Sequence, residues 1–254
     1  MNYDDLIDTT AKLGYMLVFN GAEVYRAEES MRRIFMSYGA GPGEVFVIPT
    51  FLSVSVVTPE GRAITRIKRI PPCEMDLDKV EKLNGLCRRV CVCTPDVSYI
   101  RRELDAIAES PVFPFWVQTA AYAAVGFFFT LFYGGNFRDA AVAMLCGGII
   151  KLVCGALKKL KVNSFFVNAA ASFFAASAAL FAAYADVYLN YDKIIIGALM
   201  SLVPGIAITE FMHDIIVGDL IAGLLRLAES LLTAAAIAVG AGAALAAMRM
   251  LMGV

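Results

Sequence analysis

The stretch that decides the fold is Pro114–Tyr133, which reads PFWVQTAAYAAVGFFFTLFY and contains no charged residue. A helix needs about 20 mostly apolar residues to cross a hydrocarbon core of roughly 30 Å. Trp116 and Tyr133 lie near its two ends, where aromatic side chains gather at membrane interfaces. The stretch therefore predicts a membrane-spanning helix.

Further apolar segments follow this one towards the end of the sequence. Together they predict spans near residues 114–133, 140–157, 164–184, 194–212 and 228–249. We therefore expect residues 113–254 to form a transmembrane helical domain, a bundle of about five spans in the lipid bilayer. Lys151 is the single charge inside the second span, and we expect it to snorkel towards the lysines that follow. Small residues spaced four apart indicate helix contacts in a bundle or an oligomer; they are Gly197, Ser201 and Gly205, and Ala236, Gly240 and Ala244.

The positive charges between the spans predict the orientation. Lys158, Lys159 and Lys161 follow the second span, whereas the loops near Arg138 and Lys193 carry one positive charge each. Loops rich in lysine and arginine stay in the cytoplasm, so residues 1–112 are expected there too. An odd number of spans then places the C-terminus outside a cell inner (cytoplasmic) membrane that the chain crosses several times.

The charged residues concentrate before the first span. Residues 1–112 hold 14 of the 22 Lys and Arg and 16 of the 23 Asp and Glu, which marks a boundary near Ser110–Pro114. Apolar residues at helical spacing predict two helices, the second over 22–38, and alternation predicts strands over 45–48, 51–58 and 63–70. Two more helices are expected through 80–90 and 97–107. The predicted fold class is a membrane α-helical bundle preceded by a small α+β cytoplasmic domain, residues 1–112.

Several classes of function are disfavoured by composition. A net charge of -1 provides no basic field for nucleic acid. Cys87, Cys91 and Cys93 lack metal-finger spacing, so we expect neither a metal nor a cofactor and interpret all six cysteines, Cys73, Cys146 and Cys154 included, as reduced thiols. The single histidine, His213, lies outside the first 112 residues, which excludes a Ser-His or Cys-His catalytic centre within that domain.

The fourth predicted span is interrupted at Pro204-Gly205. Proline removes a backbone donor and crowds the carbonyl four residues back, and lipid cannot satisfy the groups that this frees. Broken helices in membranes line wet cavities or are buried in protein, and they often hold substrate sites. A simple kink is the alternative.

Ionisable residues follow the break directly. If the helix continues, Glu210, His213 and Asp214 share one face, with Thr209 beside them. Two carboxylates one turn apart in a low dielectric raise one another's proton affinity. Such a pair could bind a proton or a cation as a coupled unit.

Asp219, Gly223 and Arg226 form a second predicted face, with Glu229 three residues further on. A guanidinium there could hold a substrate carboxylate through two parallel hydrogen bonds. The alternative is that Arg226 only neutralises Asp219 or Glu229. So many ionisable groups in an apolar segment are costly, which favours a functional role.

The candidates in the first domain are Glu23, Arg26 and Glu28, which cluster with Glu29 in the second predicted helix. An isolated charge run of this kind is typical of a solvated helix face.

Two stretches resemble a known family. The residues Gly21–Glu29 (GAEVYRAEE), followed by Pro49-Thr50, resemble the N-terminal signature of the threonine/serine exporter family. The residues Gly197–Gly205 (GALMSLVPG), continuing to Asp214 and then Gly218–Glu229 (GDLIAGLLRLAE), resemble its membrane signature. The resemblance covers nearly the whole chain.

The resemblance is to the larger, YjjP-type subunit of the split form, which works with a smaller YjjB-type membrane subunit. It implies export of threonine and serine, or of dicarboxylates such as succinate, driven by the proton motive force. By the motif match it implies pathway roles for Pro204, Gly205, Asp214, Asp219, Gly223, Arg226 and Glu229, and a role for Glu28. Glu210 and His213 depart from the residues usual in the family, so a proton role for them would be particular to a subgroup.

Two other functions compete with a secondary transporter subunit. A membrane-anchored, hydrolase-like enzyme would need a base such as Glu28 or Glu29, and a sensor or scaffold would bind a ligand without moving it. An anchor requires neither five spans nor buried charges. We therefore expect a transporter of small amino or carboxylic acids that is not an enzyme and works as a homo- or hetero-oligomer.

Overall fold

The protein is described by a computed structural model covering residues 2–72 and 75–252; Cys73 lies outside the described residues. The chain divides into two compact units. The first runs to Pro111 and also contains Thr209–Arg226, whereas the second holds Val112–Ile208 and continues from Leu227. A stretch within the predicted transmembrane domain thus belongs to the first unit.

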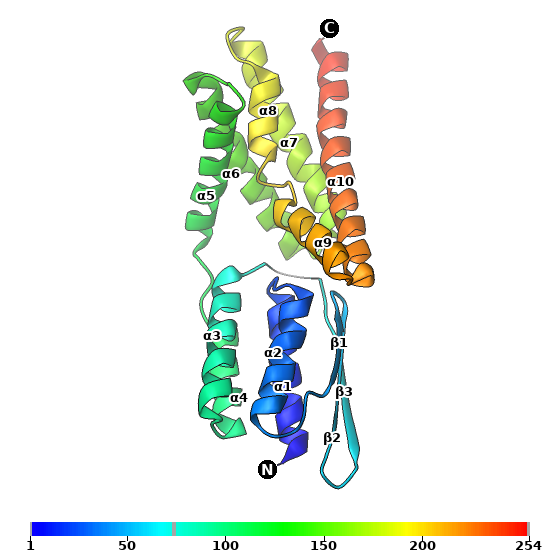
Figure 1. Cartoon of the computed structure of the whole chain (residues 1–254). Coiled ribbons are helices and arrows are strands. Elements are labelled where there is room, and N and C mark those ends of the chain that lie inside the picture. The colour runs from blue at the N-terminus through cyan, green and yellow to red at the C-terminus, as the bar shows by residue number, and fades with distance from the viewer. Residues whose placement is uncertain (1, 73–74, 253–254) are drawn as a thin grey trace. The chain divides into compact units, whose positions relative to one another are not determined.

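The first unit is a small α+β domain (Figure 1). Its elements are α1 (Tyr3–Phe19), α2 (Val24–Ser37), β1 (Glu44–Ile48), β2 (Phe51–Val57), β3 (Ala63–Arg69), α3 (Leu77–Cys93) and α4 (Val97–Ala108). Asn2, Asp76 and Asp96 cap α1, α3 and α4 through side-chain oxygens that accept backbone N–H groups. Local sequence therefore determines where these helices begin.

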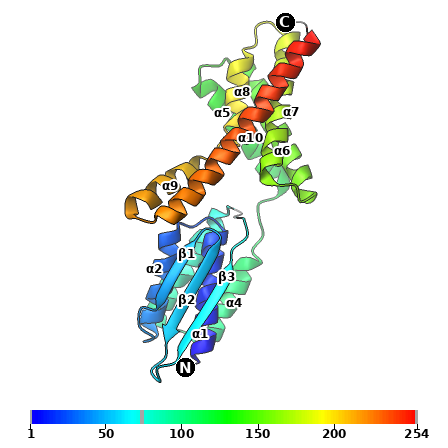
Figure 2. The same ribbon diagram turned by 90° about the vertical axis from the view of Figure 1, so that its right-hand side faces the viewer.

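The three strands form an antiparallel sheet in the order β1-β2-β3. Val54 of β2 pairs with Val45 on one side and Arg66 on the other. The apolar residues of one face are buried under α1 and α2, and α3 and α4 pack on these helices in turn (Figure 2). The sheet and its alternation of buried and exposed residues confirm the three predicted strands.

The second unit is helical. It contains α5 (Phe115–Phe132), α6 (Phe137–Lys159), α7 (Ser164–Ala185), α8 (Tyr191–Leu199) and most of α10 (Leu220–Met252), and α9 (Gly205–Val217) begins in it. Within the described residues, four helices are long and apolar enough to cross a membrane: α5, α6, α7 and Leu220–Met250 of α10. The protein is therefore a multi-pass membrane protein by fold and composition.

The predicted fourth span, residues 194–212, is not one helix. The helix α8 ends at Leu199, and α9 starts only at Gly205, after the interruption at Pro204. The last helix also begins earlier than predicted, at Leu220 instead of near residue 228. The interruption predicted at Pro204-Gly205 is thereby confirmed. The early start of α10 follows a turn at Gly218, which lies in an apolar run where hydropathy alone does not detect it.

Small residues allow backbones to approach closely in the second unit. A Cβ on Gly197 would lie 2.8 Å from the Cα of Thr130 in α5, and one on Gly240 would lie 2.1 Å from the Ala169 carbonyl oxygen in α7. No neighbour lies within 4 Å of a Cβ built on Gly205, so that member of the predicted stripe makes no such contact among the described residues. The stripes therefore serve the bundle only in part.

Lys151 reaches the beginning of α5. Its ammonium donates to Gln118 Oε1 at 2.5 Å and lies 5.9 Å from the ring centroid of Phe115, the first residue of α5. The side chain thus points to the end of α5 that lies against the C-terminal part of α6, the direction predicted for it.

Candidate functional site

The site is built on the hairpin of α9 and α10. Gly218 ends α9 with φ +102, and the N–H groups of Gly218 and Asp219 both donate to the Asp214 carbonyl, at 3.1 and 2.8 Å. A Cβ on Gly223 would lie 2.7 Å from Ile215 Cγ1 and 3.1 Å from the Phe211 carbonyl oxygen. Glycine at 218 permits the turn, and glycine at 223 permits the two helices to touch (Figure 2).

The hairpin brings Arg226 against two carboxylates. Arg226 forms an ion pair with Glu210, and its Nε lies 3.5 Å from Asp214 Oδ2. The side chains of Arg226, Glu210 and Asp214 are only 8%, 13% and 1% exposed. These three residues, which we call the Arg226 cluster, form a buried charge network. Breaking such a network at one member costs far more than breaking a surface pair.

The start of α2 lies against this cluster within the first unit. Arg226 donates from a terminal nitrogen to the Ala22 carbonyl at 3.3 Å, in the turn that Gly21 makes with φ +94. The ring of Tyr25 lies over that of His213, with centroids 5.0 Å apart. The two stretches that carry the family resemblance therefore meet in space and form one site instead of the two that the sequence predicts.

Two buried polar atoms of the site have no hydrogen-bond partner among the described residues. They are Asp214 Oδ2 and His213 Nδ1. Buried polar atoms are nearly always satisfied by protein or ordered water, and exceptions commonly mark places that receive a ligand or a proton. Both exceptions lie next to each other on α9.

Burial, more than the neighbouring charges, sets the pKa of Asp214. Burial raises the pKa of Asp214 to about 6, with a smaller contribution from Asp219, while His213 opposes the rise and Glu23 adds to it. A carboxylic acid with this pKa exchanges its proton near physiological pH.

Glu28 connects α2 to the sheet. Its Oε1 accepts the Val47 N–H at 2.9 Å and its Oε2 accepts Arg32 at 3.0 Å, which ties α2 to β1. Burial raises the pKa of Glu28, and Asp219 contributes in the same direction, while the hydrogen bond from Val47 and the charge of Arg32 lower it. Arg26 instead is more than half exposed and pairs with Glu23.

The structure groups some of the predicted residues and separates others. Glu210, His213, Asp214, Gly223 and Arg226 come together, and Asp219 and Glu23 lie close enough to affect Asp214. Pro204, Gly205 and Glu229 belong to the second unit, and Thr209 and Glu229 are exposed. The two predicted faces, one on α9 and one on α10, lie against each other, because the turn at Gly218 folds α9 back on α10.

Sequence reasoning missed two contributors, the carbonyl of Ala22 and the ring of Tyr25. Both lie inside the stretch GAEVYRAEE, and the motif was the only signal that could have found them. Asp214 is only 1% exposed, so its carboxyl group is not solvated.

The fold and the site define a class of protein: a multi-pass membrane protein with a buried, mixed-charge cluster inside the unit that combines its α+β elements with Thr209–Arg226. A family model described as "Putative threonine/serine exporter" (ThrE) matches residues 8–248, so the chain belongs to the threonine/serine exporter family. This membership confirms the resemblance to the family.

One curated relative supports the same conclusion. The "Probable threonine/serine exporter" of Mycobacterium tuberculosis (strain ATCC 25618 / H37Rv) is 21% identical over 237 residues, which cover 92% of this chain and 45% of the relative. The chain thus spans about half the length of this relative. No solved structure matches the chain.

Proposed function

We propose that the chain is a secondary transporter subunit that exports threonine and serine or small dicarboxylates such as succinate. The observation that carries the proposal is the buried Arg226 cluster. All these substrates carry a carboxylate, and a guanidinium binds a carboxylate through two parallel hydrogen bonds. A substrate carboxylate would take the place that Glu210 or Asp214 occupies on Arg226.

We propose that a proton drives this exchange. Asp214, with a pKa of about 6, takes up a proton readily. A deprotonated Asp214 would hold the ammonium of threonine or serine while Arg226 holds the substrate carboxylate. Uptake of a proton by Asp214 from the outer side would remove that negative charge and release the substrate, and the proton would then be carried inward. Proton uptake and substrate binding would thereby exclude each other, as export driven by an inward proton gradient requires.

We further propose a fifth crossing made by α8 and the irregular segment after it. The nine residues of α8 cover roughly 14 Å at about 1.5 Å per residue, about half of a core of about 30 Å. Residues 200–208 would cover the rest, with Pro204 buried against protein instead of lipid. Five crossings, with the lysines after α6 inside, put the N-terminus in the cytoplasm and the C-terminus outside.

The partner in this proposal is the smaller YjjB-type membrane subunit, and the support is the resemblance to the split form of the family. We expect transport to need both proteins. Transport by this chain alone would show that the smaller subunit is not required.

The test is counterflow of labelled threonine and labelled succinate into vesicles that hold this chain, with and without the co-expressed smaller subunit. Exchange of one of the two substrates supports the proposal. Active export of that substrate should in addition stop when the proton gradient is collapsed. Saturable binding without exchange would favour the sensor, and turnover of amides or esters would favour the enzyme. Exchange of neither substrate by folded protein would reject both substrates.

A further inference from the structure

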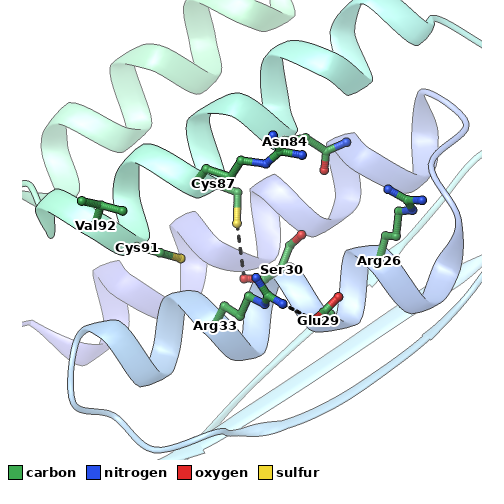
Figure 3. A pocket seen from close by; sticks show the side chains of 9 residues that line it. Arg26, Glu29, Ser30, Arg33, Asn84, Cys87, Cys91 and Val92 are labelled. Atoms are coloured by element: carbon green, nitrogen blue, oxygen red, sulfur yellow. Dashed lines mark hydrogen bonds and ion pairs between the residues drawn. The ribbon is translucent and has the colours of Figure 1, made fainter.

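A pocket of about 300 Å³ lies between α2 and α3 of the first unit (Figure 3), and no residue of the Arg226 cluster lines it. Its lining consists of Arg26, Glu29, Ser30, Arg33, Asn84, Cys87, Arg88, Cys91 and Val92. The volume is at the lower end of the range for sites that enclose small molecules. Neither the family match nor the curated relative assigns anything to it.

Positive charge dominates the pocket. Three guanidinium groups line it against the single carboxylate of Glu29, which Arg33 already binds at 2.5 Å. Arg88 forms no ion pair with any residue of the described chain, so its charge is left for a ligand or for solvent. A concave site with an excess of guanidinium groups favours an anion.

The other lining groups add hydrogen-bond donors. The Asn84 amide and the Ser30 hydroxyl face the same space as the arginines, as Figure 3 shows. Guanidinium forks match the oxygens of carboxylates and phosphates in pairs, and a side-chain amide or hydroxyl can complete the coordination.

The cysteines do not make this a thiolate or soft-metal site. Cys87 donates its S–H to the Ser30 carbonyl at 3.7 Å, and burial raises the pKa of its thiol to about 12. The thiol therefore stays neutral at physiological pH and does not compete with an anion for the arginines.

We propose that this pocket binds a soluble small dianion that carries phosphate or carboxylate groups, with Arg33 and Arg88 as its main contacts. Arg26 lines the pocket and also pairs with Glu23, which influences Asp214. An anion that draws Arg26 away from Glu23 would make the surroundings of Asp214 more negative. This consequence, though not the binding itself, rests on the proposed function, and it would make export sensitive to the bound anion.

The test is isothermal titration calorimetry on the full chain in detergent, with inorganic phosphate and succinate in separate arms. Saturable binding of phosphate below about 10 mM is expected, with about tenfold weaker binding in Arg88→Gln and in Arg33→Gln. Because Arg226 is proposed to hold succinate as well, succinate binding counts for the pocket only where these two variants weaken it. The control Arg62→Gln, an exposed arginine in the turn between β2 and β3, should bind as the wild type does.

A further arm separates this pocket from the transport site. Arg226→Gln should retain phosphate binding if the protein folds, so failure of the transport proposal leaves this result unaffected. Equal affinity in all variants, or no binding by the wild type, would overturn the pocket proposal. If a short-chain phosphatidylglycerol binds and neither phosphate nor succinate does, the ligand is not a soluble dianion.

Discussion

Arg226 holds two buried carboxylates, and its removal would leave both without their counter-charge. We expect Arg226→Gln to lower the free energy of unfolding by about 3–5 kcal/mol, the usual cost of an orphaned buried charge. The measurement is thermal unfolding in detergent. The control is Arg249→Gln, because Arg249 lies on the same helix and is exposed.

A double variant tests the reason for this loss. If the loss comes from uncompensated charge, Arg226→Gln with Glu210→Gln should be more stable than Arg226→Gln alone. Additive losses would instead mean that the two residues do not interact in the folded protein.

The raised pKa of Asp214 predicts that the free energy of unfolding depends on pH. Its pKa is about 6 in the folded chain and about 3.9 in an unfolded chain, so the folded state binds the proton more tightly. The resulting stabilisation is complete below about pH 4 and is lost as the pH rises through 6, a change on the order of 3 kcal/mol. Asp214→Asn should flatten the profile of melting temperature between pH 4.5 and 7.5.

The matched control is Asp192→Asn, because Asp192 is exposed in the first turn of α8. It should keep the wild-type slope. A slope that is the same in all three proteins would show that Asp214 does not titrate in this range.

At the scale of elements, the hairpin of α9 and α10 depends on the absence of a side chain at position 223. Gly223→Ala would push a methyl group into Ile215 and the Phe211 carbonyl, and we expect a loss of about 1–3 kcal/mol. Gly242→Ala on the same helix is the control, because no atom lies within 4 Å of its Cβ. Alanine there should be neutral or should stabilise the helix by up to about 1 kcal/mol.

Equal melting temperatures for the two glycine variants would contradict the close packing of α9 on α10. A loss of transport in Gly223→Ala with unchanged stability would place the effect on the site alone.

The elements differ in how far the sequence could predict them. The helices α5, α6 and α7 follow from long apolar runs, and the three strands follow from alternation next to the Pro59–Gly61 turn. The division of residues 194–212 between α8 and α9 was visible only as Pro204-Gly205. Its consequence, a separate α9 folded back on α10, needs the tertiary contact at Gly223.

The same limit applies to the site. Helical spacing placed Glu210, His213 and Asp214 on one face, as the structure has them. The contact of Arg226 with Ala22 joins residues 204 positions apart, and no local pattern encodes such a contact. The family resemblance marked both partners without indicating that they touch.

For the whole molecule, the number of crossings decides on which side of the membrane the C-terminus lies. Four long helices alone would place both termini on the same side, whereas the proposed fifth crossing through α8 places them on opposite sides. We expect a C-terminal alkaline phosphatase fusion to be active and an N-terminal one to be inactive. Labelling of single cysteines at both ends with an impermeant reagent is an independent check, and equal labelling would remove the fifth crossing.

If the Arg226 cluster carries transport, loss of the Asp214 carboxylate should stop it, and counterflow of the accepted substrate in Asp214→Asn measures this. The comparison needs equal amounts of folded protein for wild type, Asp214→Asn and Asp192→Asn, each with the smaller subunit present. Exchange near background is expected for Asp214→Asn, and wild-type exchange is expected for Asp192→Asn. Wild-type exchange in Asp214→Asn would show that the cluster does not carry transport.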